Sequence, residues 1–263
     1  RSEGEVARAL EKTLAGCRGR VVVTCFASNL ARILAQSVYY VHGWLRLPRD
    51  IRSDAVFVVP TGNFGNVFAG FLAREMGLPI ANFRVATNQN DILHRFFTSG
   101  DYSVGRVTPS HAPSMDIQVA SNFERFLFYH QDGNPARVRT AMENFRETGG
   151  LRVENFEVEA FSSSCIDDAG IVEVIRHVHR EHGYTLDPHT ACAFGDLDPG
   201  RPHVILSTAH PAKFPETVKL ATGHEPLSPV LEKLKNLPVR KHLIPADLAE
   251  VRAFIEARSV ASM

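Results

Sequence analysis

The residue types best suited to binding an anion lie in a turn rich in glycine and asparagine, residues 61–66. An apolar run at 56–59 predicts a buried parallel strand before the turn, and apolar residues at helical spacing follow it up to Met76. Free main-chain amides at a helix N-terminus, helped by the helix dipole, can hold a phosphate group. Two glycines would let the main chain approach it, and Asn63 and Asn66 could donate hydrogen bonds to it.

Two well-known nucleotide loops do not match this turn. A Walker A loop needs a Gly-Lys-Ser/Thr sequence, and residues 61–66 contain no lysine. The glycine spacing also differs from the Gly-x-Gly-x-x-Gly pattern of dinucleotide folds. The sequence pattern alone therefore leaves two interpretations open, a phosphate site and a tight strand-to-helix turn without a ligand.

A second candidate for chemistry is the pair of hydroxyl residues Ser207 and Thr208, which end an apolar stretch at 203–208 that predicts a strand. Ligands of open α/β sheets bind at the carboxyl ends of the strands, so these hydroxyls are well placed to contact a cofactor ring. The alternative is that they cap the following loop. Lys213 could meet a substrate anion or lie on the surface.

Three further patterns are better explained without chemistry. His177, His179 and His182 lie among charged residues without a carboxylate at metal-site spacing, which is typical of a solvated helix face. Residues 162–165 lack the glycines of a nucleophile elbow and indicate a polar loop. The adjacent acids at 167–168 are typical of a helix cap rather than an acid/base pair.

Strand and helix patterns alternate from residue 21 to residue 97, starting with a strand at 20–26. This alternation predicts an α/β fold, a mostly parallel open sheet with helices on both faces. Alternating residues at 153–161 predict another strand, and residues 99–113 predict an irregular loop. The helix after residue 29 is expected to face the core with these apolar residues: Leu30, Ile33, Leu34, Val38 and Val41.

Composition narrows the class of protein. The 263 residues are 44% hydrophobic and 22% charged, with a formal net charge of zero, which favours neither nucleic-acid nor membrane-surface binding. No apolar run has the length of a membrane span. Four cysteines without a C-x-x-C pair are typical of free thiols in a reducing compartment, and no signal peptide is visible, so we expect a cytoplasmic protein.

Several segments together resemble the threonine synthase family, in the same order along the chain between residues 21 and 223. Residues 27–36 resemble, as a variant, the family's Asn-Ser-Ile-Asn-Trp-Ala-Arg stretch. The other segments are Pro60-Thr-Gly-Asn-Phe-Gly-Asn66, Ala86-Thr-Asn88 with Asn90-Asp-Ile-Leu93, Pro113-Ser-Met-Asp-Ile117 with Ser121-Asn-Phe-Glu-Arg125, Asp187-Pro-His-Thr-Ala191, and Leu206-Ser-Thr-Ala-His-Pro-Ala-Lys-Phe214.

The resemblance implies a pyridoxal 5'-phosphate enzyme of fold type II, the tryptophan synthase β-like class. It would convert O-phospho-L-homoserine and water to L-threonine and phosphate. By position, the cofactor phosphate would be held by Gly62, Asn63, Phe64 and Asn66, and Thr208 would bond the pyridine nitrogen. A hydroxyl there leaves that nitrogen largely unprotonated. Weaker candidates for the substrate side are Asn29, Arg84 and Lys213.

One departure from the family concerns catalysis. The family attaches its cofactor through a lysine in a Phe-Lys-Asp context upstream of the glycine-asparagine turn, whereas the only lysine before Gly62 here is Lys12, in Glu-Lys-Thr. The expected Schiff-base lysine thus has no counterpart. Because the sequence also opens at Arg1, we expect residues 1–263 to be the carboxyl-terminal portion of a longer catalytic domain, inactive alone.

Other functions stay open on sequence grounds. A relative with the same cofactor fold could eliminate phosphate to give a 2-oxo acid, because both reactions would use the same phosphate turn. A degenerate, non-catalytic binding module would also explain the missing lysine. The sequence does not choose between a monomer and a homodimer.

Overall fold

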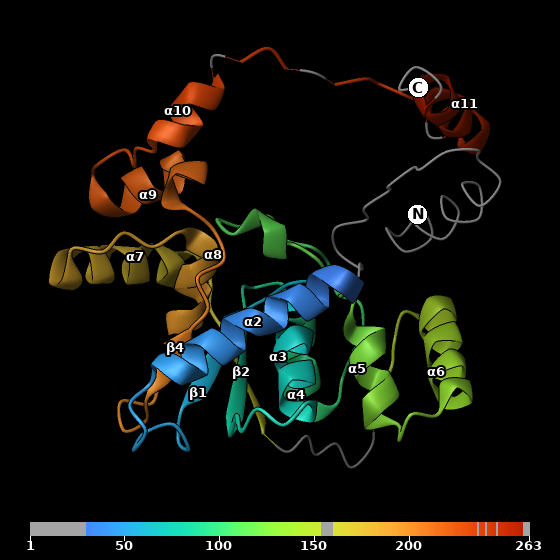
Figure 1. Cartoon of the computed structure of the whole chain (residues 1–263), viewed down its shortest axis with the longest axis horizontal. Helices are drawn as coiled ribbons and strands as arrows, with labels where there is room; N and C mark the ends of the chain where they lie inside the picture. Colours follow the sequence, from blue (N-terminus) through green and yellow to red (C-terminus); the bar gives the residue numbers. More distant parts are fainter. Residues whose placement is uncertain (1–29, 154–159, 236, 240, 246, 260–263) are drawn as a thin grey trace.

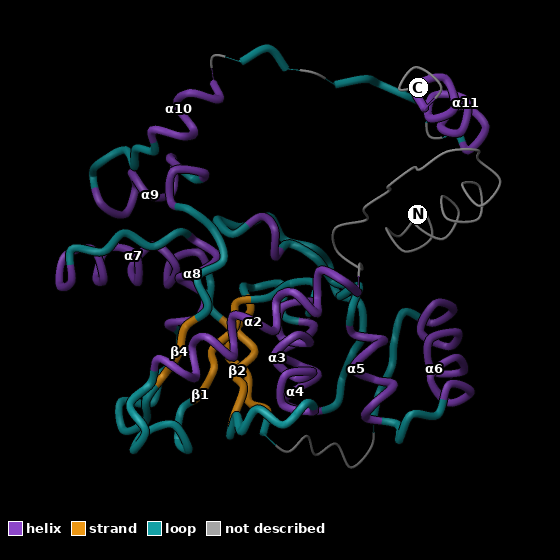
Figure 2. The backbone as a smooth tube through the Cα atoms, viewed as in Figure 1, coloured by secondary structure: helices purple, strands orange, loops and turns teal. Residues whose placement is uncertain are grey.

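The computed structural model describes residues 30–153 and 160–259, except for residues 236, 240 and 246. At its centre lies a four-stranded, wholly parallel sheet (Figures 1 and 2). The strand order is β3-β2-β1-β4, with bounds Phe161–Cys165, Asn82–Thr87, Val56–Pro60 and His203–Ile205. In-register pairs such as Val59 with Val85 align the carboxyl ends of β1 and β2. This confirms the predicted α/β fold with a parallel sheet.

Helices cover both faces of the sheet, as expected from apolar strands that are buried on both sides. On one face, Phe57 and Val59 pack in a large aromatic core with α2 (Leu30–Arg46) and α3 (Gly65–Glu75). On the other face, Val58 packs against Ala193 of the short helix η2 (Cys192–Phe194).

The other helices build two hydrophobic clusters. Helices α4, α5 and α6 contribute side chains to the aromatic core, and α7, α8 and α9 contribute to a second cluster that contains Ile171, Ala191 and Ala221. Their bounds are α4 Ile92–Ser99, η1 Pro113–Met115, α5 Phe123–His130, α6 Pro135–Thr148, α7 Asp168–His182, α8 Pro188–Ala191, η3 Pro211–Lys213, α9 Pro215–Thr222, α10 Pro229–Lys235 and α11 Leu248–Ser259. Within the described ranges, no helix is long and apolar enough to span a bilayer.

Two sequence expectations about these elements were wrong. The polar loop expected at 162–165 is instead part of β3, and all four of its residues pair with β2. Pairing with β2 outweighs the low strand propensity of serine, because the main-chain hydrogen bonds are satisfied there. The strand expected at 153–161 lies mainly in residues 154–159, which are outside the described residues. The strand expected at 20–26 lies outside the described residues.

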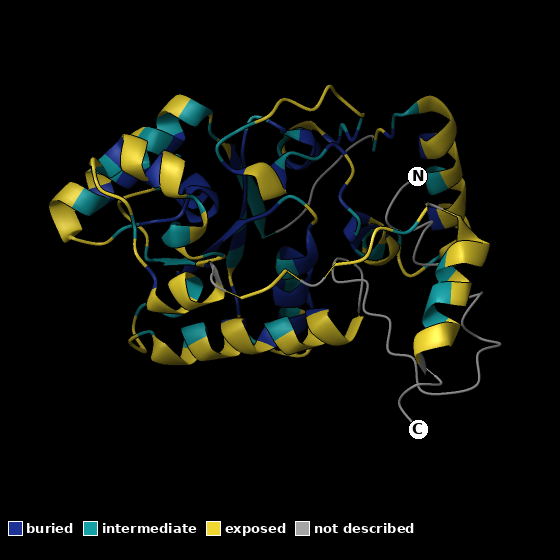
Figure 3. Cartoon of the chain, turned by 90° about the horizontal axis from the view of Figure 1, so that it is seen from above, coloured by how far each residue is buried: buried dark blue, intermediate teal, exposed yellow. Residues whose placement is uncertain are grey.

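The buried face of α2 is the second correction. Ile33, Ser37 and Tyr40 point into the core, whereas most of the expected inward residues are exposed (Figure 3). The exposed side chains form a stripe along the helix: Leu30, Leu34, Val38, Val41 and Leu45. Tyr40 decides the orientation, because its ring contacts Phe57 and Phe83 at centroid distances of 5.4 and 6.0 Å.

Candidate functional site

The turn at 61–66 folds as a strand-to-helix connection that is fixed by its own side chains. The hydroxyl of Thr61 accepts a hydrogen bond from the amide of Phe64 at 3.0 Å. The side-chain oxygen of Asn63 accepts one from the amide of Gly65 at 2.9 Å. Among the described residues, the amides of Gly62, Asn63 and Asn66 donate no hydrogen bond. These three N–H groups are therefore available to a ligand.

Phe64 anchors this turn in the protein core. It has a left-handed conformation with φ 64°, which is unfavourable for a residue with a side chain. Its ring is fully buried and stacks on Phe97 at 5.6 Å, with an edge contact to Phe126 at 5.4 Å. The aromatic packing offsets the backbone strain and holds the turn rigid.

Gly62 lies where a side chain would not fit. A Cβ added there would lie 3.0 Å from the Cα of Met115 and 3.2 Å from the side chain of Ile117. The segment containing η1 thus packs directly against the turn. A glycine at this position keeps the main chain both closely packed and open toward a ligand.

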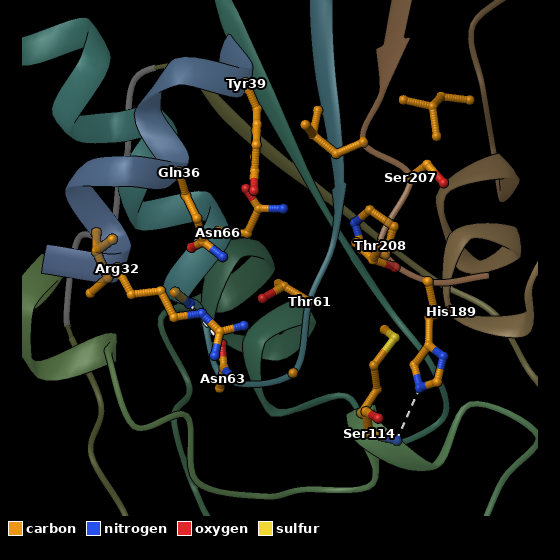
Figure 4. Close-up of a pocket in the computed structure, with 18 of the residues that line it drawn as sticks. Arg32, Gln36, Tyr39, Thr61, Asn63, Asn66, Ser114, His189, Ser207 and Thr208 are labelled. Atoms are coloured by element: carbon orange, nitrogen blue, oxygen red, sulfur yellow. Dashed lines mark hydrogen bonds between the residues drawn. The ribbon is translucent and has the colours of Figure 1, made fainter. Parts of the chain in front are cut away.

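A cavity of about 850 Å³ lies in front of the turn, and Figure 4 shows the side chains around it. Gly62, Asn63 and Asn66 line one side of it, and Thr208 and Lys213 line it from the segment after β4. None of the described residues that line the cavity is an aspartate or a glutamate. An anion with an apolar body would therefore meet donors and cations but no repelling carboxylate.

The structure places the other predicted site residues differently. The ring of Phe64 is buried in the core and its amide is already paired with Thr61, so it supports the turn rather than lining the cavity. Arg84 is absent from the cavity lining and donates a hydrogen bond to the main-chain oxygen of Asp196. Asn29 lies outside the described residues.

Three residues that line the cavity had not been singled out from the sequence. Arg32 extends from α2 toward Asn63, and His189 and Ser114 meet on the opposite side (Figure 4). The Nε2 atom of His189 accepts a hydrogen bond from the amide of Ser114 at 3.0 Å. His189 and Ser114 are 75 residues apart. Their meeting depends on the tertiary fold, although both lie in segments that carry the resemblance.

Beside the cavity, Asp187 caps α8 while almost fully buried. Burial by itself would raise the pKa of this carboxyl group, but hydrogen bonds from His189 and Thr190 outweigh it and lower the pKa below the ordinary value. Asp187 is therefore a buried anion at neutral pH. The described residues contain no cluster of His, Cys, Asp and Glu that could hold a metal ion.

Comparison with known proteins agrees with this geometry. The family model described as "Threonine synthase, C-terminal" matches residues 189–255. Threonine synthase from Pseudomonas aeruginosa is 45% identical over an alignment of 249 residues, which covers 90% of this chain and 53% of that protein. The chain belongs to the threonine synthase family. It spans about half the length of the curated threonine synthases it matches.

Solved threonine synthases share the fold. A crystal structure of pyridoxal-phosphate-bound threonine synthase from Brucella melitensis superposes with a TM-score of 0.80 at 35% identity, covering 97% of this chain and 57% of that one. The yeast threonine synthase superposes with a TM-score of 0.76 at 32% identity, covering 89% and 53% of the two chains. The sheet of this chain is accordingly that of a fold type II threonine synthase.

Proposed function

We propose that this chain is the carboxyl-terminal portion of a pyridoxal-phosphate-dependent threonine synthase, which converts O-phospho-L-homoserine and water to L-threonine and phosphate. One observation carries the proposal. The free amides of the turn at 62–66 and the hydroxyl residue Thr208 line the same cavity, from two segments that are more than 140 residues apart in the sequence. A cofactor with a phosphate at one end and a pyridine ring at the other matches this pair.

The residues present fit pyridoxal phosphate at both ends. Gly62, Asn63 and Asn66 would hold the phosphate through main-chain amides and the side-chain nitrogens of the two asparagines. Thr208 would donate its hydroxyl to the ring nitrogen and so favour the unprotonated ring. When bound, the cofactor supplies an electron sink for carbanions formed on the substrate.

The substrate phosphate needs a second anion site in the same cavity. Lys213, predicted from the sequence, and Arg32, which the structure adds, are the cations that line it. We assign these two cations to the phosphate of O-phospho-L-homoserine, because guanidinium and ammonium groups suit a phosphate that is gripped and later released. Asn29 stays a candidate from the sequence, whereas the contact of Arg84 with Asp196 leaves it no part in this assignment.

The Schiff-base lysine is proposed to come from the part of the enzyme that this chain does not span, and the assembled enzyme is proposed to be cytoplasmic. The test is to combine this chain with the part of the Pseudomonas aeruginosa threonine synthase that it does not span. L-threonine and phosphate should form from O-phospho-L-homoserine only in the mixture. A 2-oxo acid as the product would replace the proposal by an elimination activity. A purified chain that turns over alone would contradict the assignment of the lysine.

A further inference from the structure

Asp187 occupies a position from which it reaches both ends of the proposed cofactor cradle. It is 1% exposed, and its Oδ1 atom accepts hydrogen bonds from the amides of His189 at 2.9 Å and Thr190 at 3.1 Å. These bonds cap α8, a helix of only four residues. A serine or an asparagine could cap such a short helix without burying a charge. The charge of Asp187 therefore calls for a further explanation.

One branch leads from Asp187 to the ring end of the cavity. The hydroxyl of Thr190 donates a hydrogen bond to Oδ2 of Asp187. Because the hydroxyl proton of Thr190 is donated to the carboxylate, its oxygen can accept a hydrogen bond from the main-chain amide of Thr208, at 3.1 Å. Asp187 thereby fixes both the direction of the Thr190 hydroxyl and the backbone that presents the Thr208 side chain.

The other branch leads to the phosphate end. The Nδ1 atom of His189 lies 3.5 Å from Oδ1 of Asp187. The Nε2 atom of the same ring accepts a hydrogen bond from the amide of Ser114 at 3.0 Å, so the proton of a neutral ring lies on Nδ1. Nδ1 makes no hydrogen bond among the described residues, and its contact with the carboxylate is electrostatic. Ser114 precedes Met115, whose Cα packs against Gly62. His189 thus supports the segment on which the anion-binding turn rests.

We propose that Asp187 is a positioning residue that sets the two ends of the cradle relative to one another, through Thr190 to Thr208 and through His189 to the turn at Gly62. The inference rests on the proposed function, because it concerns the cofactor that this function requires. It assigns a role to the Asp187–Ala191 motif, which the proposed chemistry does not otherwise use. Asp187 itself touches neither end of the ligand.

The experiment uses two ligands that separate the two ends. Pyridoxine 5'-phosphate carries both the phosphate and the pyridine ring but no aldehyde, so it binds without a lysine, whereas inorganic phosphate probes only the turn. Their dissociation constants are measured with the full chain by isothermal titration. The variants are Asp187→Asn, Thr190→Val and Thr190→Ser, with Asp167→Asn as the control, because Asp167 caps α7 in the same way outside the cavity.

Thr190→Val should weaken the affinity for pyridoxine 5'-phosphate by about tenfold, the effect of one lost hydrogen bond, and leave the affinity for inorganic phosphate unchanged. Thr190→Ser keeps a hydroxyl group and should therefore bind both ligands with the affinities of the parent chain. Asp187→Asn retains an oxygen to cap α8 but replaces the other carboxylate oxygen, an acceptor, by an NH2 group, a donor. It should therefore weaken the affinity for both ligands. Asp167→Asn should change neither. Hydrogen exchange at the Thr208 amide should be faster in Thr190→Val than in the parent chain.

Each contrary result has a distinct meaning. Two results would overturn the positioning role while the proposed function stands, provided that the parent chain binds both ligands. In the first, the dissociation constants of Thr190→Val for both ligands stay within twofold of the parent values. In the second, Thr190→Val loses affinity for both ligands equally. If the parent chain binds neither ligand, the proposed function fails and the inference fails with it. If the Thr208 amide exchanges equally fast in both proteins, the Thr190 branch is wrong whatever the affinities.

Discussion

The hydroxyl of Tyr40 lies 2.7 Å from the main-chain oxygen of Asn66 and 3.0 Å from its side-chain oxygen. This contact ties α2 to the first turn of α3, at the entrance of the anion-binding turn. It also directs the side-chain nitrogen of Asn66 toward the cavity (Figure 4). Complete burial raises the pKa of Tyr40 well above its ordinary value, so the hydroxyl keeps its proton and stays a donor.

Replacing Tyr40 by phenylalanine should therefore act on stability and on binding together. The variant keeps the ring packing but removes the hydrogen bond that Tyr40 donates to Asn66, which should cost about 1–2 kcal/mol of unfolding free energy. Affinity for inorganic phosphate should fall as well, because Asn66 is no longer oriented. Urea denaturation and phosphate titration measure the two effects. Tyr184→Phe, at a side chain that is 57% exposed, should change neither.

Gly70 should not tolerate even a methyl group. A Cβ there would lie 2.4 Å from Cε1 of Tyr40 and 2.7 Å from Cε1 of Phe83. Alanine improves helix propensity by about 1 kcal/mol, but forcing two buried rings apart typically costs about 1–3 kcal/mol, so Gly70→Ala should lower the melting temperature. Gly195→Ala is the control, because its added Cβ has no contact closer than 3.6 Å. A melting temperature of Gly70→Ala at or above the parent value would refute the close packing.

Asp116 should govern the order of the irregular loop before it. Its Oδ1 accepts hydrogen bonds from Asn88 at 2.7 Å, Asn90 at 2.9 Å and Ser110 at 2.6 Å, and its Oδ2 accepts the Ser110 amide. Asp116→Asn replaces one acceptor by a donor, at a cost of about 1–3 kcal/mol. Limited proteolysis should then cut within residues 99–112 faster, whereas the exposed Asp50→Asn should digest at the parent rate. Equal digestion would show that other contacts hold the loop.

The stability of the fold should decline in acid partly through Asp187. Its pKa is lowered in the folded protein, since the hydrogen bonds from His189 and Thr190 outweigh the effect of burial. A depressed carboxyl pKa contributes stability above the unfolded value, about pH 4, and this contribution disappears as the pH falls through the folded pKa. Melting temperatures of Asp187→Asn measured between neutral pH and pH 3 should show a shallower decline than those of the parent chain. Parallel curves would contradict this linkage.

The sequence predicted the parallel sheet because its signals are local. The apolar strands around Val58 and Val85, and the cap residue Asp167, each show a pattern within a few residues. The strand at Ser162–Ser164 could not be found in this way, because it depends on pairing with β2, almost 80 residues earlier. The prediction of which face of α2 is buried failed for a related reason, since that face is set by the packing of Tyr40 against Gly70 of another helix.

The candidate site was partly predictable for the same physical reason. The phosphate turn and Thr208 follow strands, and the ends of parallel strands gather at one edge of a sheet. The supports of the site were not predictable, because Asn90, Asp116 and His189 act through hydrogen bonds between distant segments. The resemblance pointed to the motifs that contain them but not to these structural roles.

The left-handed Phe64 couples ligand binding to the whole interior. A glycine at this position would have released the turn from the core, whereas the phenylalanine ring ties it to Phe97 and Phe126. The turn therefore cannot relax unless the aromatic cluster moves. A ligand that tightens the turn should consequently slow global unfolding, and a substitution deep in the aromatic cluster should speed ligand dissociation although it never touches the ligand.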